Sequence, residues 1–308
     1  MDFKGRDVVS IRDFSKEEIN HILKTAETMV RIAEGKGKSK LLEGKILANL
    51  FFEPSTRTRL SFESAMHRLG GKVLGFSSSA GTSLSKGEML SDTIRMASSY
   101  SDIVVVRNPF EGSARFCTRF SDRPVINAGD GAGQHPTQTL LDLFTIKSEF
   151  KEIDGLSVAL MGDLKYGRTV HSLAYALALF GAKLHFVAPP ELQMPNEILS
   201  DCKNLGVEPV LHNSVNDVIP EVDVLYVTRI QKERIPDEKE YQKVANSYRI
   251  TTDLLKSAKE NMRVMHPLPR ISEIEPSVDS TPHALYFKQA FNGLPVRMAL
   301  LTLVLGVE

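Results

Sequence analysis

Short apolar runs alternate with segments of helical periodicity along this chain, in two successive series. The first series of apolar runs is KILANLFF (45–52), KVLGF (72–76), DIVVVR (102–107) and PVINAG (124–129). The second is SVALMG (157–162), KLHFVAP (183–189), PVLHN (209–213), DVLYVTR (223–229) and MRVMHP (262–267). Strands buried on both faces read as nearly continuous apolar runs and belong to parallel sheets covered by helices. The sequence therefore predicts an α/β fold with two domains, each a parallel sheet flanked by helices.

Several segments between these runs carry helix signals. Residues 13–34 form an amphipathic pattern that opens with Ser15 and Glu18, the spacing of a capping box. Residues 136–150 (PTQTLLDLFTIKSEF) predict a long helix that Pro136 opens at its first position, and we place the domain boundary within it. SVNDVIPEV (214–222) is expected to be helical, as is a final apolar segment at about 287–305.

The composition excludes several classes of protein. Among 308 residues, Lys and Arg total 38 and Asp and Glu total 38, so the basic excess of a nucleic-acid binder is absent. The two cysteines, Cys117 and Cys202, are far apart and the eight histidines are scattered, which argues against a metal site. The start MDFKGRDVVS lacks a signal-peptide core, and no apolar run is long enough to span a membrane. We expect a cytoplasmic protein whose local positive clusters bind small anions.

The stretch FFEPSTRTRLSFE (51–63) is the densest such cluster. Directly behind an apolar run, Ser55, Thr56, Arg57 and Thr58 offer hydroxyls, backbone N–H groups and a guanidinium to a single anion. The alternative is a well-capped helix with two solvated arginines, which explains each residue but not their coincidence. The stretch therefore predicts a phosphate site.

Two further loops lead from a predicted strand into a helix. In GDGAGQHPTQ (129–138), His135 precedes the helix start, where the helix dipole favours a neutral imidazole, and Gln138 lies one turn on. GDLKYGRT (162–169) approaches a phosphate-binding P-loop but has Arg168 where that motif needs lysine. We interpret it as a turn that directs Arg168 at a carboxylate or phosphate. A nucleotide-binding protein remains an alternative at this point.

Three more segments carry candidate polar groups. TRIQKER (228–234) supplies Arg229, Gln231 and Arg234, and HPLPR (266–270) supplies the carbonyl groups around Pro267, Leu268 and Pro269. Such X-Pro pairs can also simply turn the chain. TSLSKG (82–87) is a polar, glycine-flanked loop with Ser83 and Lys86, although most loops of this kind are only connectors.

These motifs together resemble the catalytic chains of aspartate carbamoyltransferases, within the aspartate/ornithine carbamoyltransferase superfamily. STRTR followed by LSFE, QHPTQ, GDLKYGRTVHSL, TRIQKER and HPLPR occur in the order typical of that family, over essentially the whole chain. STRTR and HPTQ are shared with ornithine carbamoyltransferases, whose last motif typically reads HCLP. Here Pro267 replaces that cysteine, and Arg168, Arg229 and Lys86 suit a dicarboxylate and would repel a cationic ornithine. An ornithine-type enzyme, or a silent scaffold of this fold, is the remaining alternative.

The resemblance implies a reaction and a set of roles. Carbamoyl phosphate and L-aspartate would give N-carbamoyl-L-aspartate and phosphate in pyrimidine biosynthesis, without cofactor or metal. Arg57, Thr58, Arg107 and His135 would be catalytic, the last three pointing at the carbonyl oxygen. The carbamoyl phosphate site would comprise Ser55, Thr56, Arg57, Thr58, Arg107, His135, Gln138, Pro267, Leu268 and Pro269. The aspartate site would comprise Lys86, Arg168, Arg229 and Gln231.

The resemblance also implies domains and partners. The carbamoyl phosphate domain would be 1–136 with a C-terminal helix at about 290–308, the aspartate domain 150–286, and 137–149 an interdomain helix, so that long helices join the two. Ser83 and Lys86 would come from a neighbouring chain of a homotrimer, to which a separate regulatory chain could bind. We further expect Glu53 to pair with Arg168 and Arg234 on domain closure. The alternative is a local salt bridge from Glu53 to Arg57 or Arg59.

Overall fold

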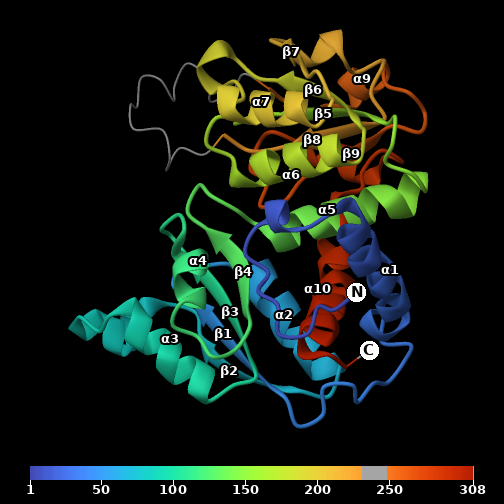
Figure 1. Ribbon diagram of the computed structural model, residues 1–308. Helices are drawn as coiled ribbons and strands as arrows, with labels where there is room; N and C mark the ends of the chain where they lie inside the picture. The colour runs from blue at the N-terminus through green and yellow to red at the C-terminus, as the bar shows by residue number, and fades with distance from the viewer. Residues whose placement is uncertain (231–247, 308) are drawn as a thin grey trace. The chain divides into compact units, whose positions relative to one another are not determined.

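The computed structural model describes residues 1–230 and 248–307, which fall into two compact units (Figure 1). The first unit consists of residues 1–144 with 291–308, and the second of residues 145–290. The division falls within helix α5 (Pro136–Phe150). Helix α10 (Tyr286–Leu305) begins in the second unit and returns the chain to the first.

The first unit is built on a four-stranded parallel sheet. Its order is β2 (Lys72–Phe76), β1 (Ile46–Phe51), β3 (Ile103–Asn108) and β4 (Val125–Asp130). On one face, Leu50 and Val104 pack against Ile94 of α3 (Leu90–Ser99) and Cys117 of α4 (Ser113–Thr118). Helix α2 (Thr56–Arg68) follows β1 directly. The parallel sheet predicted from the first series of apolar runs is confirmed.

Helix α1 (Lys16–Ala33) opens with the predicted capping box. The Ser15 hydroxyl accepts from the Glu18 N–H, and the Glu18 carboxylate accepts from the Ser15 N–H. Each bond satisfies a backbone donor that the helix itself leaves unpaired, so the helix begins where the sequence places it.

The second unit is built on a five-stranded parallel sheet, as the second series predicts. Its order is β7 (Val210–His212), β6 (Lys183–Val187), β5 (Ser157–Met161), β8 (Val224–Val227) and β9 (Arg263–Met265). Described helices that lie wholly within this unit include α6 (Arg168–Leu179), α7 (Asn196–Asn204) and the short α9 (Thr252–Leu255). Met161, Leu225 and Val264 share one buried cluster on this sheet.

One predicted helix is wrong. Residues 214–222 form only the short 3-10 turn η5 (Val215–Asp217), which the Ser214 hydroxyl caps by accepting from Asn216 N–H. Pro220 explains the difference, because it lacks an N–H group and disfavours helical backbone at the residue before it. In the part of the chain that the structure describes, none of the helices combines the length and apolar character needed to cross a bilayer.

Candidate active site

The start of helix α2 has the features expected of an anion site. Ser55 is its N-cap, with extended backbone (φ −159°, ψ 105°), and its hydroxyl makes no capping hydrogen bond. The first-turn N–H groups of an α-helix have no partner within the helix and carry the positive end of its dipole. Thr58 is buried, whereas Thr56 and Arg57 are exposed. The predicted cluster 55–58 is thus a helix start that can still donate hydrogen bonds to an anion.

Arg107 lies at the end of β3, beside this helix start. β1 and β3 are neighbours in parallel register, with Phe51 opposite Arg107. The Arg107 side chain is only 10 % exposed, and its Nη1 donates to the Ala128 carbonyl oxygen at 3.1 Å. Its Nη2 donates to Glu53 Oε1 at 2.9 Å. The structure therefore pairs Glu53 with Arg107, a partner that the sequence analysis did not suggest.

The electrostatics around Arg57 favour a negatively charged ligand. Burial of its guanidinium and the positive charge of Arg107 both lower the pKa of Arg57. Arg57 as a whole residue is exposed, but its guanidinium is partly buried. Water therefore screens its charge only incompletely. A phosphate between these two cations would remove their repulsion, so the arrangement of the two guanidiniums favours an anion.

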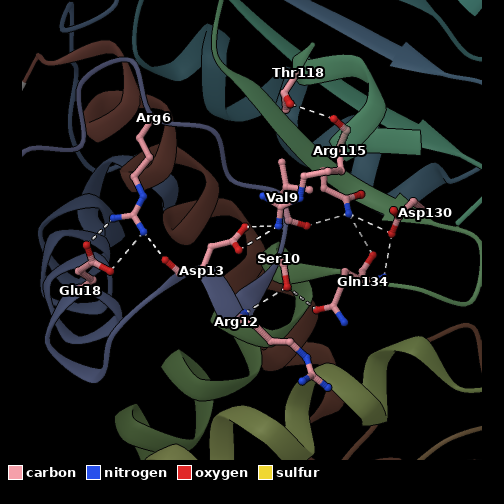
Figure 2. A network of polar contacts seen from close by, with 11 residues as sticks. Arg6, Val9, Ser10, Arg12, Asp13, Glu18, Arg115, Thr118, Asp130 and Gln134 are labelled. Atoms are coloured by element: carbon pink, nitrogen blue, oxygen red, sulfur yellow. Dashed lines mark hydrogen bonds and ion pairs between the residues drawn. The ribbon is translucent and has the colours of Figure 1, made fainter. Parts of the chain in front are cut away.

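The loop between β4 and α5, which carries His135, is held by Asp130 (Figure 2). Asp130 is buried; its Oδ1 accepts from Gln134 N at 2.8 Å and from Asn127 Nδ2 at 3.0 Å, and its Oδ2 accepts from Gly112 N at 2.9 Å. The Ser10 hydroxyl donates to Gln134 Oε1 at 3.1 Å.

His135 follows this fixed loop directly. It is itself buried, and Thr137 Oγ1 lies 3.5 Å from its Nδ1. Sequence analysis found His135 but missed Asp130, whose only signal was an acidic residue in a glycine-rich loop. The network fixes the backbone from which His135 enters the first turn of α5.

In the second unit, Arg168 and Arg229 follow the ends of neighbouring strands. Arg168 is buried at the start of α6, and Arg229 comes two residues after β8. Gly162 allows the two strand ends to approach, because it has φ +115° and an added Cβ would lie 2.2 Å from the Thr228 carbonyl oxygen. Two guanidiniums after neighbouring parallel strands suit a dicarboxylate ligand. The predicted residues Gln231 and Arg234 lie outside the described residues.

The loop 162–169 does not have the geometry of a nucleotide-binding P-loop. Leu164 N donates to the Leu192 carbonyl oxygen at 3.1 Å, and Tyr166 N donates to Asp163 Oδ1 at 3.0 Å. A P-loop needs such N–H groups for phosphate oxygens. Because protein acceptors already occupy them here, the nucleotide-binding alternative loses its support.

The loop after β9 is fixed by a buried histidine and glutamate that sequence analysis missed. Leu268 N donates to His266 Nδ1 at 2.8 Å, so the Nε2 of a neutral His266 donates to Glu273 Oε1, also at 2.8 Å. Ile271 N and Ser272 N each donate to Glu273 Oε2 at 3.0 Å. Burial alone would raise the pKa of Glu273, but the hydrogen bond from His266, together with backbone donors that include Ile271 N, lowers it to about 2.

The backbone of this loop carries the predicted carbonyl groups. Leu268 has φ +57°, and the Leu268–Pro269 peptide bond is cis. His266 is also held by its backbone, because the backbone N–H of His266 donates to Gln289 Oε1 at 2.8 Å. The Pro267 and Leu268 carbonyls therefore belong to a segment whose conformation is specified by side chains on both sides.

Ser83 and Lys86 lie on the surface of the first unit. They form the ends of η3 (Ser83–Lys86), which contains no buried residue and ends at Gly87 in left-handed conformation (φ +93°). Among the described residues, Lys86 Nζ makes no ion pair. Its charge is thus available to a ligand or to another chain.

Comparison with known proteins gives the same family for both units. The family profile described as "Aspartate/ornithine carbamoyltransferase, carbamoyl-P binding domain" matches residues 6–148, and "Aspartate/ornithine carbamoyltransferase, Asp/Orn binding domain" matches residues 154–304. The aspartate carbamoyltransferase catalytic subunit of Thermococcus kodakarensis is 60 % identical over 307 residues, covering 100 % of this chain and 99 % of the relative. That of Archaeoglobus fulgidus is 58 % identical over 300 residues, covering 97 % and 99 %.

Solved structures agree. The catalytic subunit of M. jannaschii aspartate transcarbamoylase superposes with a TM-score of 0.89 at 53 % identity, covering 96 % of each chain. Aspartate transcarbamoylase from Trypanosoma cruzi in complex with carbamoyl phosphate and aspartate superposes with a TM-score of 0.93 at 42 % identity, covering 98 % of each chain.

Proposed function

Because the chain belongs to the aspartate/ornithine carbamoyltransferase family, we propose that it transfers the carbamoyl group of carbamoyl phosphate to the amine of L-aspartate. The products are N-carbamoyl-L-aspartate and phosphate, and the reaction belongs to pyrimidine biosynthesis. The observation that carries this choice is the 60 % identity, over the full chain, to a catalytic subunit named for aspartate. The ornithine alternative has no comparable support, and Pro267 in HPLP further disfavours it.

The first unit supplies the groups for the carbamoyl donor. Ser55, Thr56 and Arg57 at the start of α2 would hold the phosphate. When the aspartate amine attacks the carbonyl carbon, negative charge develops on the carbonyl oxygen. Thr58, Arg107 and His135 would donate to that oxygen, and preorganised donors of this kind typically contribute the largest single part of catalysis. Collapse of the tetrahedral intermediate then expels phosphate toward the 55–58 cluster.

The second unit supplies the groups for aspartate. Arg168 and Arg229 would pair with its carboxylates, with Gln231 as a further contact, and the Pro267 and Leu268 carbonyls would hold the carbamoyl amine beside Gln138. A cationic ornithine side chain placed against these guanidiniums would be repelled. The charge of the site thus selects the acceptor.

The assembly belongs to the same proposal. Ser83 and Lys86 would reach the active site of a neighbouring chain, so that a cytoplasmic homotrimer is the smallest active unit. Lys86 supports this because its charge makes no ion pair within the described residues. The relatives carry the name catalytic subunit, which fits a separate regulatory chain as a further partner.

The test is an assay of the purified chain with carbamoyl phosphate and either L-aspartate or L-ornithine. Carbamoyl aspartate should form, and citrulline should not. Arg229→Ala should raise the KM for aspartate by about tenfold to a hundredfold, the value of one or two charge-assisted hydrogen bonds. It should leave the Kd of a carbamoyl phosphate analogue unchanged. Arg249→Ala, which breaks only an exposed ion pair with Glu275, serves as the control. Equal losses for both substrates in Arg229→Ala would exclude the assigned role.

A further inference from the structure

The side-chain amide of Gln138, on the first turn of α5, is oriented by a buried carboxylate. Gln138 Nε2 donates to Asp142 Oδ1 at 2.9 Å, one turn further along the helix. Asp142 is fully buried and Gln138 nearly so. Because the amide nitrogen faces Asp142, Gln138 Oε1 faces the other way. Within residues 1–230 and 248–307, that oxygen accepts no hydrogen bond.

A buried arginine on α10 experiences the negative charge of Asp142. Burial lowers the pKa of Arg297 to about 10, while the negative charge of Asp142 acts in the opposite direction. The Arg297 guanidinium also lies over the ring of Phe62 on α2, 5.1 Å from its centroid. Gly293 leaves room for it, since an added Cβ would lie 2.1 Å from Arg297 Nη1. The Asp142 carboxylate beneath Gln138 thus lies within the electrostatic influence of a buried guanidinium that packs on α2.

We propose that Asp142, supported by Arg297, is a positioning residue that presents Gln138 Oε1 as a hydrogen-bond acceptor to the NH2 group of the carbamoyl donor. This inference rests on the proposed function. A carbamoyl group differs from an acetyl group only in having NH2 where the latter has CH3. An acceptor oxygen forms a hydrogen bond with the NH2 group and stays unpaired against a methyl group. If the Gln138 side-chain amide were reversed, its own NH2 group would face the NH2 group of the carbamoyl donor. Asp142 therefore selects carbamoyl phosphate against acyl phosphates, without touching the substrate.

The experiment compares two ligands that differ in the same way and cannot transfer a group, phosphonoacetamide and phosphonoacetone. Their dissociation constants are measured by calorimetry on the intact parent protein and its variants, and the ratio of the two constants is compared. This ratio does not depend on the fraction of folded protein. We expect the parent to prefer the amide by about tenfold, the value of one net hydrogen bond.

Asp142→Asn offers Gln138 both a donor and an acceptor, so its amide can turn over and the preference should fall below about threefold. Asp142→Glu keeps the carboxylate and should keep the preference. Thr139→Val is the control next to Gln138 on the same helix, because the buried Thr139 hydroxyl has no hydrogen-bond partner among the residues that the structure describes. It should bind both ligands as the parent does.

Two results would overturn the inference: a parent without preference for the amide, or an Asp142→Asn variant with the same ratio of dissociation constants as the parent. The first is measured on the parent and needs no variant to fold. Failure of the proposed function looks different, because the parent would then form no carbamoyl aspartate. A parent that forms carbamoyl aspartate, with an unaltered ligand ratio in Asp142→Asn, would refute only the role of Asp142.

Discussion

Replacing Glu273 by glutamine should destabilise the second unit by an amount that depends on pH. Glu273 accepts hydrogen bonds from His266 Nε2, Ile271 N and Ser272 N, and its pKa falls from 4.5 to about 2. Each tenfold change in proton affinity is worth about 1.4 kcal/mol, so this shift stabilises the folded state by about 3 kcal/mol. Glutamine removes the charge and replaces one acceptor oxygen by a donor. We expect Glu273→Gln to lose about 3 kcal/mol of unfolding free energy at pH 7.

The sign of the pH dependence follows from the direction of the shift. The folded state binds the Glu273 proton more weakly than the unfolded state, so the stabilisation is present above pH 4.5 and is lost as the pH falls toward 2. From these two pKa values, the difference between parent and Glu273→Gln should shrink to about 2 kcal/mol at pH 3.5.

The two buried cysteines allow the second unit to be followed by itself. Cys117 lies in the first unit and Cys202 in the second, and both are buried. In a Cys117→Ser background, pulse labelling of Cys202 across a urea series reports the opening of the second unit at each pH. Glu275→Gln is the matched control, because Glu275 pairs at 3.1 Å with an exposed Arg249 and should cost below about 1 kcal/mol. Equal losses in the two variants, or a Glu273→Gln loss independent of pH, would refute the reasoning.

Two further predictions concern the reaction. His135→Ala should lower kcat by about tenfold to a thousandfold, the range for one oxyanion donor, while the Kd of phosphonoacetamide changes little. A rise in that Kd by the same factor would instead assign His135 to ground-state binding. Inactive Lys86→Ala and inactive Arg57→Ala chains, once mixed and shown to exchange subunits, should regain part of the parent activity, since a hybrid trimer can assemble an unmutated site. Activity that stays absent after exchange would argue for sites built within one chain.

The fold could be predicted because its signals are local. Each strand of the two sheets coincides with an apolar run such as DIVVVR or SVALMG, and α1 begins at the capping box of Ser15 and Glu18. The wrong helix prediction at 214–222 also has a local cause. The apolar residues there have helical spacing, but Pro220 interrupts the helix. Helical spacing of apolar residues is therefore not sufficient for a helix where a proline removes a backbone hydrogen bond.

The supporting residues of the candidate site could not be predicted in the same way. Glu53 and Arg107 are 54 positions apart, and no periodicity relates them. Asp130 and Glu273 each look like an ordinary acidic residue in a loop until their backbone donors are known. Loop residues with hydroxyl or guanidinium groups are recognised by their chemistry, whereas the groups that position them are recognised only by their contacts.

The pairing of Glu53 with Arg107 implies an order of events at the first unit. The 2.9 Å ion pair engages a guanidinium that the proposed carbamoyl donor would also contact. An arriving phosphate carries negative charge, so it competes for Arg107 and at the same time repels Glu53. The Glu53 side chain is 28 % exposed, so part of it already contacts water. The pairing of Glu53 with Arg168 and Arg234 stays a prediction, and it requires that Glu53 first leave Arg107.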